Sequence, residues 1–434
     1  MSPVTIGILG IVLLFLLLAS RMQIGFAFAV VGFLGFAVLT SLKPSFSLMG
    51  LEPFKISASY GFTVIPLFVL MGQFANHSNM GTEAYRTAHR WIGFLPGGLA
   101  MATIGACACF AAISGSSLAS AATLGMVAIP EMKRFKYSPA LATGSVAAGG
   151  TLGILIPPST VMIIYGILTE QPIGTLFIAG VLPGLVLTLL FMLAIYIQAR
   201  LSPEIGPPGP RYPLKERVLS LREPWGILVL FVVVIGGLYT GWFTPTEAAG
   251  VGAFGAFVIM MAKGRLTWKV LKDSLAQTTR TTAMVFLILI GAHIFGYFLT
   301  LSQIPGHLSS LAVEAGLNRY IIMGLLVVAY MILGCIMEGL AIMVLTLPIV
   351  FPMILGLGFD PIWFGIVITV VMEMSLITPP IGVNVFIISG LVKEVPMHVV
   401  FKGTLPFFLT MIFFTVILIA FPDLALFLPR AMGR

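Results

Sequence analysis

Residues 149–159 read GGTLGILIPPS, and residues 373–384 read EMSLITPPIGVN. In each stretch, small residues and two consecutive prolines interrupt a long apolar segment, 138–169 in the first case and 361–391 in the second. Proline removes a backbone donor and disfavours a continuous helix. Irregular backbone at membrane depth is tolerated only where it faces protein or a water-filled cavity. We therefore expect two broken membrane helices.

The two stretches belong to an internal repeat. Pro130, Pro139 and the pair Pro157-Pro158 recur with identical spacing as Pro352, Pro361 and Pro379-Pro380, and Gly180 and Pro183 recur as Gly403 and Pro406 with one further residue inserted. So many registered positions make coincidence a poor explanation. Repeats that carry paired discontinuous helices are characteristic of secondary transporters, which bind substrate where the breaks meet.

The composition is that of a membrane protein. Only 9% of the 434 residues are charged and 59% are hydrophobic, with a mean hydropathy of +1.10, whereas soluble domains carry about 25% charged residues. Apolar segments near the roughly 20 residues needed for a span occur at 3–20, 24–41, 59–76, 138–169, 173–199, 224–240, 245–262, 281–301, 361–391 and 401–422. The sequence therefore predicts an all-α polytopic membrane protein.

Two more apolar regions, 94–130 and 320–353, are interrupted in the middle by small or polar residues. Ser114–Ser117 interrupts the first region, and Glu338-Gly339 interrupts the second. We interpret each region as a re-entrant hairpin that enters and leaves by one side of the membrane.

The distribution of Lys and Arg orients the chain. Most of the 23 basic residues fall in cytoplasmic loops if both termini are periplasmic, if the first hairpin enters from the cytoplasm and if the second enters from outside. This orientation makes the two repeats inverted copies in a bacterial inner membrane. The expected organisation is scaffold helices with an interfacial arm at 42–58 (1–93), the first repeat (94–199), a cytoplasmic proline-rich linker (200–223), scaffold helices with a second arm at 263–280 (224–319), the second repeat (320–422) and a C-terminal tail (423–434).

Other functional classes find little support. The five histidines and three cysteines form no zinc or disulfide pattern, no nucleophile–base motif indicates an enzyme, and no nucleic-acid partner is expected. The first apolar segment has no basic residue before it, so it is interpreted as a retained helix in the lipid bilayer and not as a signal peptide.

The breaks carry the candidate chemistry. Freed carbonyls and Ser, Thr and Asn oxygens suit a dehydrated Na⁺, and the N-terminal ends of half-helices suit a carboxylate. Candidate substrate-binding residues are Ser116, Thr151, Pro158, Ser159, Ser375, Pro380 and Gly382. Glu338 and Glu373 are acids expected at membrane depth, where such residues are usually functional. Glu247 is expected to cap a helix start. Close packing of small residues is the alternative for these clusters.

At the same residues the sequence resembles the large membrane subunit of the tripartite ATP-independent periplasmic (TRAP) transporters, the DctM-like family. The resemblance extends over nearly the whole chain. It is carried by IPLFVLMG (65–72), FAAISGSSLA (110–119), GILIPPS (153–159), FTPTEAA (243–249) and TPPIGVN (378–384). Taken together these motifs are specific, although each alone is weak.

The resemblance implies an elevator mechanism, Na⁺ coupling, a small four-helix membrane partner subunit and a periplasmic binding protein that delivers an organic acid. It places the sodium ions between each hairpin tip and broken helix, which here are Ser114, Gly115, Ser116, Ser117, Gly149, Gly150, Thr151, Glu338, Gly339, Thr378, Pro379 and Asn384. The expected substrate is a small carboxylate whose identity the sequence leaves open.

Three alternatives remain at this point. A stand-alone carboxylate carrier or cation/proton antiporter of the same broad superfamily would work without a binding protein. An ion channel would require a continuous polar pore lining, which the broken-helix pairs disfavour. An intramembrane enzyme would require a paired catalytic motif.

Overall fold

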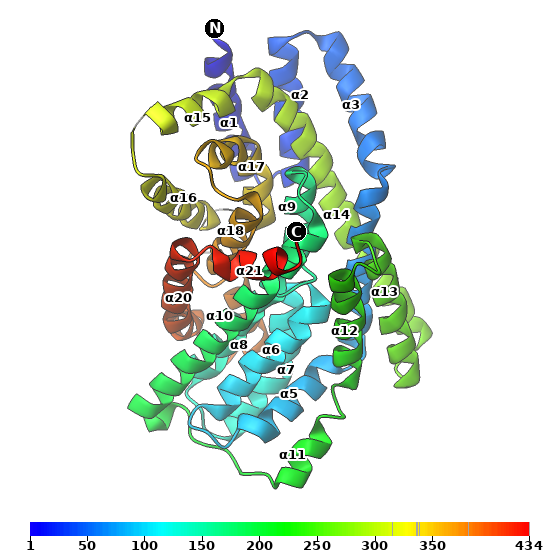
Figure 1. The fold of residues 1–434 in the computed structure, drawn as a ribbon, viewed down its shortest axis with the longest axis vertical. Helices are drawn as coiled ribbons and strands as arrows, with labels where there is room; N and C mark the ends of the chain where they lie inside the picture. Colours follow the sequence, from blue (N-terminus) through cyan, green and yellow to red (C-terminus); the bar gives the residue numbers. More distant parts are fainter. Residues whose placement is uncertain (315, 336, 338, 381, 434) are drawn as a thin grey trace.

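The computed structural model describes residues 1–314, 316–335, 337, 339–380 and 382–433, and within these ranges the chain is helical without a strand (Figure 1). The predicted all-α fold is confirmed. The α-helices are α1 (Pro3–Ala19), α2 (Ile24–Leu39), α3 (Leu42–Ser57), α4 (Val64–His77), α5 (Met80–Ile92), α6 (Gly98–Ser114), α7 (Ser117–Arg134), α8 (Pro139–Leu155), α9 (Thr160–Leu168), α10 (Ile173–Leu201), α11 (Leu214–Ser220), α12 (Trp225–Thr240), α13 (Pro245–Ala262), α14 (Trp268–Leu301), α15 (Ile304–Glu314), α16 (Arg319–Gly334), α17 (Gly339–Gly356), α18 (Pro361–Ser375), α19 (Val383–Leu391), α20 (Met397–Ala420) and α21 (Asp423–Ala431).

The first predicted hairpin is a pair of helices, α6 and α7, that pack against each other. Gly115 separates them with a positive φ of 59°, a conformation that glycine adopts without steric cost. Ser116 then caps α7, because its side chain accepts a hydrogen bond from the backbone N–H of Ala119. The expected break at Ser114–Ser117 is confirmed.

Both predicted broken helices are also broken at the expected positions. In the first, α8 ends at Leu155 and α9 begins at Thr160; in the second, α18 ends at Ser375 and α19 begins at Val383. The Pro157-Pro158 and Pro379-Pro380 peptide bonds are both cis.

The second hairpin consists of α16 and α17, with the interruption between Gly334 and Gly339. Glu338, which was expected at this break, lies outside the described residues. Gly339 is buried at the first position of α17.

The helices form two packed groups that contact each other. In one group α14 packs along α2 and α4, and α4 also packs against α13. In the other group α8 packs against α6, α7 and α20. Glycines allow close approach in both groups, since a Cβ added at Gly291 would lie 2.1 Å from the Gly25 carbonyl oxygen and one added at Gly403 would lie 1.9 Å from the Ala140 carbonyl oxygen.

In several connecting segments the structure contains helices, or helix boundaries, that the sequence pattern did not predict. From Trp268 onward, the expected arm 263–280 continues without interruption into the apolar segment that follows it, as the 34-residue helix α14. The expected tail contains α21, whose Ala425 and Leu426 are buried where the helix packs against α10. The polar stretch after α4 forms α5, and the proline-rich linker contains α11, which lies at the end of the long axis opposite the N-terminus (Figure 1).

The predicted capping role of Glu247 is confirmed. Thr244 and Glu247 form a reciprocal capping box at the start of α13, in which each side chain satisfies a backbone N–H of the other residue.

In the described part of the chain, six segments are long and apolar enough to cross a membrane if α8 and α9 count together as one, or up to eight if each of two bent helix pairs is also one span. Several other apolar helices, including α1, α2, α6, α16 and α18, are shorter. The molecule is therefore a multi-span membrane protein whose apolar helices are repeatedly interrupted.

Candidate functional site

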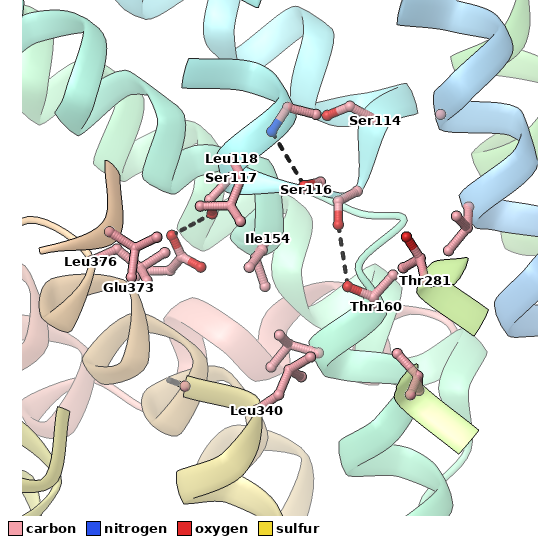
Figure 2. Close-up of a pocket in the computed structure, with 18 of the residues that line it drawn as sticks. Ser114, Ser116, Ser117, Leu118, Ile154, Thr160, Thr281, Leu340, Glu373 and Leu376 are labelled. Atoms are coloured by element: carbon pink, nitrogen blue, oxygen red, sulfur yellow. Dashed lines mark hydrogen bonds between the residues drawn. The ribbon is translucent and has the colours of Figure 1, made fainter. Parts of the chain in front are cut away.

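The two repeats meet at a cavity of about 250 Å³. Its walls come from the tip of the first hairpin, from both broken helices, from α17 at Gly339 and Leu340, and from α4 and α14. Figure 2 shows Ser114, Ser116 and Ser117 on one side of this cavity and Leu340 on another. The cavity therefore lies between the two packed groups of helices.

One buried hydrogen bond connects the two repeats at the cavity wall. The Ser117 hydroxyl donates to Oε2 of Glu373 over 2.7 Å, as Figure 2 shows. Ser117 is fully buried and Glu373 is only 2% exposed. A buried carboxylate needs compensating hydrogen bonds or a positive charge, and Ser117 lies at the N-terminal end of α7, where the helix dipole is positive.

The tip of the first hairpin is held by short-range hydrogen bonds. The Ser114 and Ser120 hydroxyls lie 3.0 Å apart, and the Thr160 hydroxyl donates to the Gly115 carbonyl over 3.3 Å. The second bond joins the hairpin tip to the start of α9. Ser116 caps α7 and Ser159 caps α9, and each side chain accepts a hydrogen bond from one N–H of the first turn. The positive N-terminal ends of two helices therefore flank the first break, an arrangement that suits an anion.

The first broken helix approaches the hairpin backbone very closely. A Cβ added at Gly153 would lie 2.6 Å from the Ser116 carbonyl oxygen, and one added at Gly150 would lie 3.0 Å from the Ser117 carbonyl oxygen. Asn384, from the other repeat, is fully buried beside Gly150. Its Nδ2 donates to the Ala147 carbonyl over 3.0 Å, while its Oδ1 accepts no hydrogen bond from the described residues.

The predicted sodium residues of the first break therefore lie around a shared region. The Ser117 carbonyl and the Asn384 Nδ2 both lie against Gly150, and the Ser116 carbonyl lies against Gly153, although Asn384 was expected at the second break. The buried Asn384 Oδ1 has no donor among the described residues, and a neutral oxygen of this kind suits a hard cation such as Na⁺. Gly149 contacts Cys107, and the Thr151 hydroxyl donates to the Ala148 carbonyl of its own helix.

The second break has fewer free oxygens among the described residues. The Ser375 and Thr378 hydroxyls donate to carbonyls of the preceding turn, those of Met372 and Met374. The Pro379 carbonyl lies 3.3 Å from the Cys335 sulfur. Ser375, Thr378 and Cys335 border a second cavity of about 210 Å³ whose other lining residues are apolar.

The larger cavity includes only part of the predicted site. Ser114, Gly115, Ser116, Ser117 and Gly339 line it, whereas Ser375 and Thr378 border the smaller cavity and the other predicted residues that the structure describes line neither cavity. Of the candidate substrate residues, Ser116 alone among the described residues borders it, and Thr151, Pro158, Ser159, Ser375, Pro380 and Gly382 do not.

The structure also adds residues that the repeat pattern did not identify. Gln73 and Asn76 of α4, Thr160 of α9 and Thr281 of α14 line the cavity. Gln73 and Asn76 are isolated polar residues near the end of an apolar segment, which was the only sequence signal for them. The described lining contains Glu373 and no Lys, Arg or His side chain.

Interrupted apolar helices whose breaks meet at a cavity between two helix groups define a membrane transporter of the inverted-repeat type. The chain matches the family model of the tripartite ATP-independent periplasmic transporter, DctM component, over residues 11–424. It therefore belongs to this family, as a large permease subunit and not an enzyme.

Individual relatives agree with this assignment. The chain is 39% identical to the C4-dicarboxylate TRAP transporter large permease protein DctM of Pseudomonas aeruginosa, over 89% of this chain and 90% of that protein. It is 31% identical to the sialic acid TRAP transporter large permease protein SiaM of Vibrio cholerae, over 95% and 96%. In fold it is similar to the Alcanivorax borkumensis YdaH transporter, with a TM-score of 0.65, 14% identity and coverage of 88% and 90%.

Proposed function

We propose that this protein is the permease subunit of a Na⁺-driven, binding-protein-dependent transporter that imports a small organic acid across the bacterial inner membrane. The cavity where both repeats meet is the observation that carries the proposal. The described lining of this cavity offers neutral oxygens, the N-terminal ends of two helices and one acid, Glu373, but no basic side chain. An uncompensated negative charge is costly in a low dielectric. An anionic substrate should therefore bind together with a cation.

The proposed sodium ligands are the oxygens at the breaks. At the first break they are Ser114–Ser117, Gly149–Thr151 and the Oδ1 of Asn384, which is buried and has no donor among the described residues. Gly339, Thr378 and Pro379 are the corresponding candidates at the second break. A bound Na⁺ supplies positive charge beside the cavity, and the substrate carboxylate is then held by Ser116 and by the N-terminal ends of α7 and α9.

The proposed substrate is a small carboxylate, in keeping with the C4-dicarboxylate and sialic acid named for two relatives. Family membership supports two partners, a small four-helix membrane subunit and a periplasmic binding protein. The separation of the helices into two packed groups with the cavity between them supports an elevator motion of one group against the other. The distribution of Lys and Arg supports periplasmic termini.

The test requires no knowledge of the substrate. The melting temperature of the purified protein is recorded while NaCl replaces KCl or choline chloride at constant ionic strength. An ion that binds only the folded state stabilises it by about 2.7 kcal/mol at a hundredfold excess over its dissociation constant. A saturable, Na⁺-selective rise supports sodium coupling, whereas equal melting temperatures in all three salts would reject it.

A further inference from the structure

The short helix α11, in the linker between the two repeats, exposes a row of large apolar side chains. Leu214, Val218 and Leu221 are 70%, 53% and 47% exposed. They are spaced by four and three residues, and Leu221 directly follows α11 with helical backbone angles, so the three side chains lie on one side of the helix. Leu219, on a neighbouring flank, is 57% exposed as well. We call Leu214, Val218 and Leu221 the α11 stripe.

Another side of α11 is fixed against the protein. The Thr87 hydroxyl of α5 donates to the Ser220 carbonyl over 2.8 Å, and the Trp91 indole N–H donates to the Arg217 carbonyl over 3.0 Å. Ser220 is only 1% exposed. Because these contacts hold the helix with its Ser220 side inward, the α11 stripe is held outward in a defined orientation.

Charged residues are distributed unevenly around the α11 stripe. Lys215 and Arg222 directly follow Leu214 and Leu221, so both lie about 100° further round the helix, on the same flank. Glu216 follows Leu214 by two residues and lies about 200° from it. All three charged side chains are exposed. The α11 stripe therefore has a basic border, and the acid lies on the far side of the helix.

The chain passes from α11 directly into a membrane helix, α12, at the end of the molecule opposite the N-terminus (Figure 1). The two helices are bent by 51° relative to each other. The 16 residues of α12 give a length of about 24 Å, slightly less than the roughly 30 Å of hydrocarbon in a bilayer. The residues just before α12 therefore lie at the membrane boundary. Trp225, the first residue of α12, is 43% exposed, and tryptophan is enriched at this depth.

We propose that α11 lies on the membrane surface, with the α11 stripe at the edge of the lipid chains and with Lys215 and Arg222 against anionic lipid headgroups. Amphipathic helices with basic flanks bind membranes in this way, and long basic side chains reach the headgroups while their stems cover apolar surface.

Two observations favour lipid over a protein partner. The apolar surface continues onto α12, where Leu228 and Val232 are 51% and 65% exposed, and the basic border matches the negative charge of anionic lipids. The proposal does not depend on sodium coupling. It gives the linker a role beyond joining the repeats, because it anchors the linker to the bilayer.

The test is photocrosslinking of the full-length protein in vesicles that contain equal amounts of phosphatidylcholine and the anionic phosphatidylglycerol. The photoreactive residue p-benzoylphenylalanine replaces Val218 in one variant and Glu216 in the matched control, which is exposed on the same helix. Mass spectrometry then identifies lipid bound to the protein. We expect several-fold more lipid adduct at position 218 than at position 216, mostly with phosphatidylglycerol, because basic residues at the surface attract anionic lipid.

Equal yields of lipid adduct at positions 218 and 216 would overturn the proposal. A crosslink from position 218 to a second copy of the chain would also overturn it, as would a crosslink to another protein when membranes of the expressing cells are irradiated. The double substitution Lys215→Gln and Arg222→Gln should keep the adduct but remove the preference for phosphatidylglycerol. If that preference persists, these two residues do not form the headgroup site. Leu214, on the same stripe, provides a second position if the Val218 variant fails to fold.

Discussion

The Ser117 hydroxyl donates a 2.7 Å hydrogen bond to the Glu373 carboxylate, and the two residues come from opposite repeats. This bond fastens the tip of the first hairpin to the second broken helix at the wall of the cavity. The integrity of the cavity should therefore depend on a pair of residues that lie far apart in the sequence.

A double-mutant cycle on this pair should reveal coupling. Ser117→Ala leaves a buried carboxylate without its donor, which should destabilise the protein by about 1–3 kcal/mol. Combined with Glu373→Gln, the effects should be non-additive by about 0.5–3 kcal/mol, measured by thermal melting in detergent. Ser145→Ala is the control, because the buried Ser145 hydroxyl donates to the Ala142 carbonyl of its own helix and so connects no second element. Additive effects of the two substitutions would contradict the prediction.

Substitution of the proposed sodium ligands should weaken the response to sodium. Asn384→Ala removes a buried oxygen that has no donor in the part of the chain the structure describes, and Ser116→Ala removes the hydroxyl at the start of α7. Both variants should need several-fold more NaCl for half of the melting shift. Thr410→Val, whose hydroxyl bonds to the Pro406 carbonyl within α20, should keep the wild-type response. Unchanged sodium curves for both Asn384→Ala and Ser116→Ala would rule out this site assignment.

Replacing a glycine at the α8–α20 contact should destabilise the fold. A Cβ at position 403 would lie 1.9 Å from the Ala140 carbonyl oxygen, so the two helices would have to separate, at a cost of about 1–3 kcal/mol. Gly250→Ala is the matched control in another membrane helix, because no atom lies within 4 Å of the added Cβ. A lower melting temperature is expected for Gly403→Ala and an unchanged or higher one for Gly250→Ala. Equal melting temperatures of the two variants would show that the contact tolerates a side chain.

His89 should make the protein less stable in mild acid. His89 lies on α5, outside the helices apolar enough to span a membrane. Burial lowers the pKa of His89 below its ordinary 6.5, although the nearby Glu131 opposes the shift. Because the unfolded chain then binds a proton that the folded protein excludes, stability should fall as the pH drops below about 6.5.

His89→Gln should reduce this loss of stability, measured as the change in melting temperature between pH 7.5 and 5.5. His398→Gln replaces an exposed histidine and should leave the wild-type dependence in place. The same pH dependence in His89→Gln as in the wild type would assign the acid sensitivity to other groups.

The sequence by itself determined the membrane class, the repeat and the positions of the breaks. Each of these follows from local chemistry. A long apolar segment favours a membrane span, and the backbone is interrupted where the prolines Pro157-Pro158 and Pro379-Pro380 and the small residues Ser114–Ser117 occur. The capping role of Glu247 was predictable for the same reason, since Thr244 lies three residues before it.

Only the tertiary structure decided which residues face one another. Residues remote in sequence meet at three places. Ser117 pairs with Glu373, Asn384 is buried beside Gly150, and Gln73 and Thr281 line the same cavity. Periodicity shows which side of a helix is apolar, but helix packing decides which neighbour that side meets. The helices α5 and α21 were missed for another reason. Both are amphipathic, with apolar residues on one side and polar residues on the other, and a search for long apolar segments does not detect such a helix.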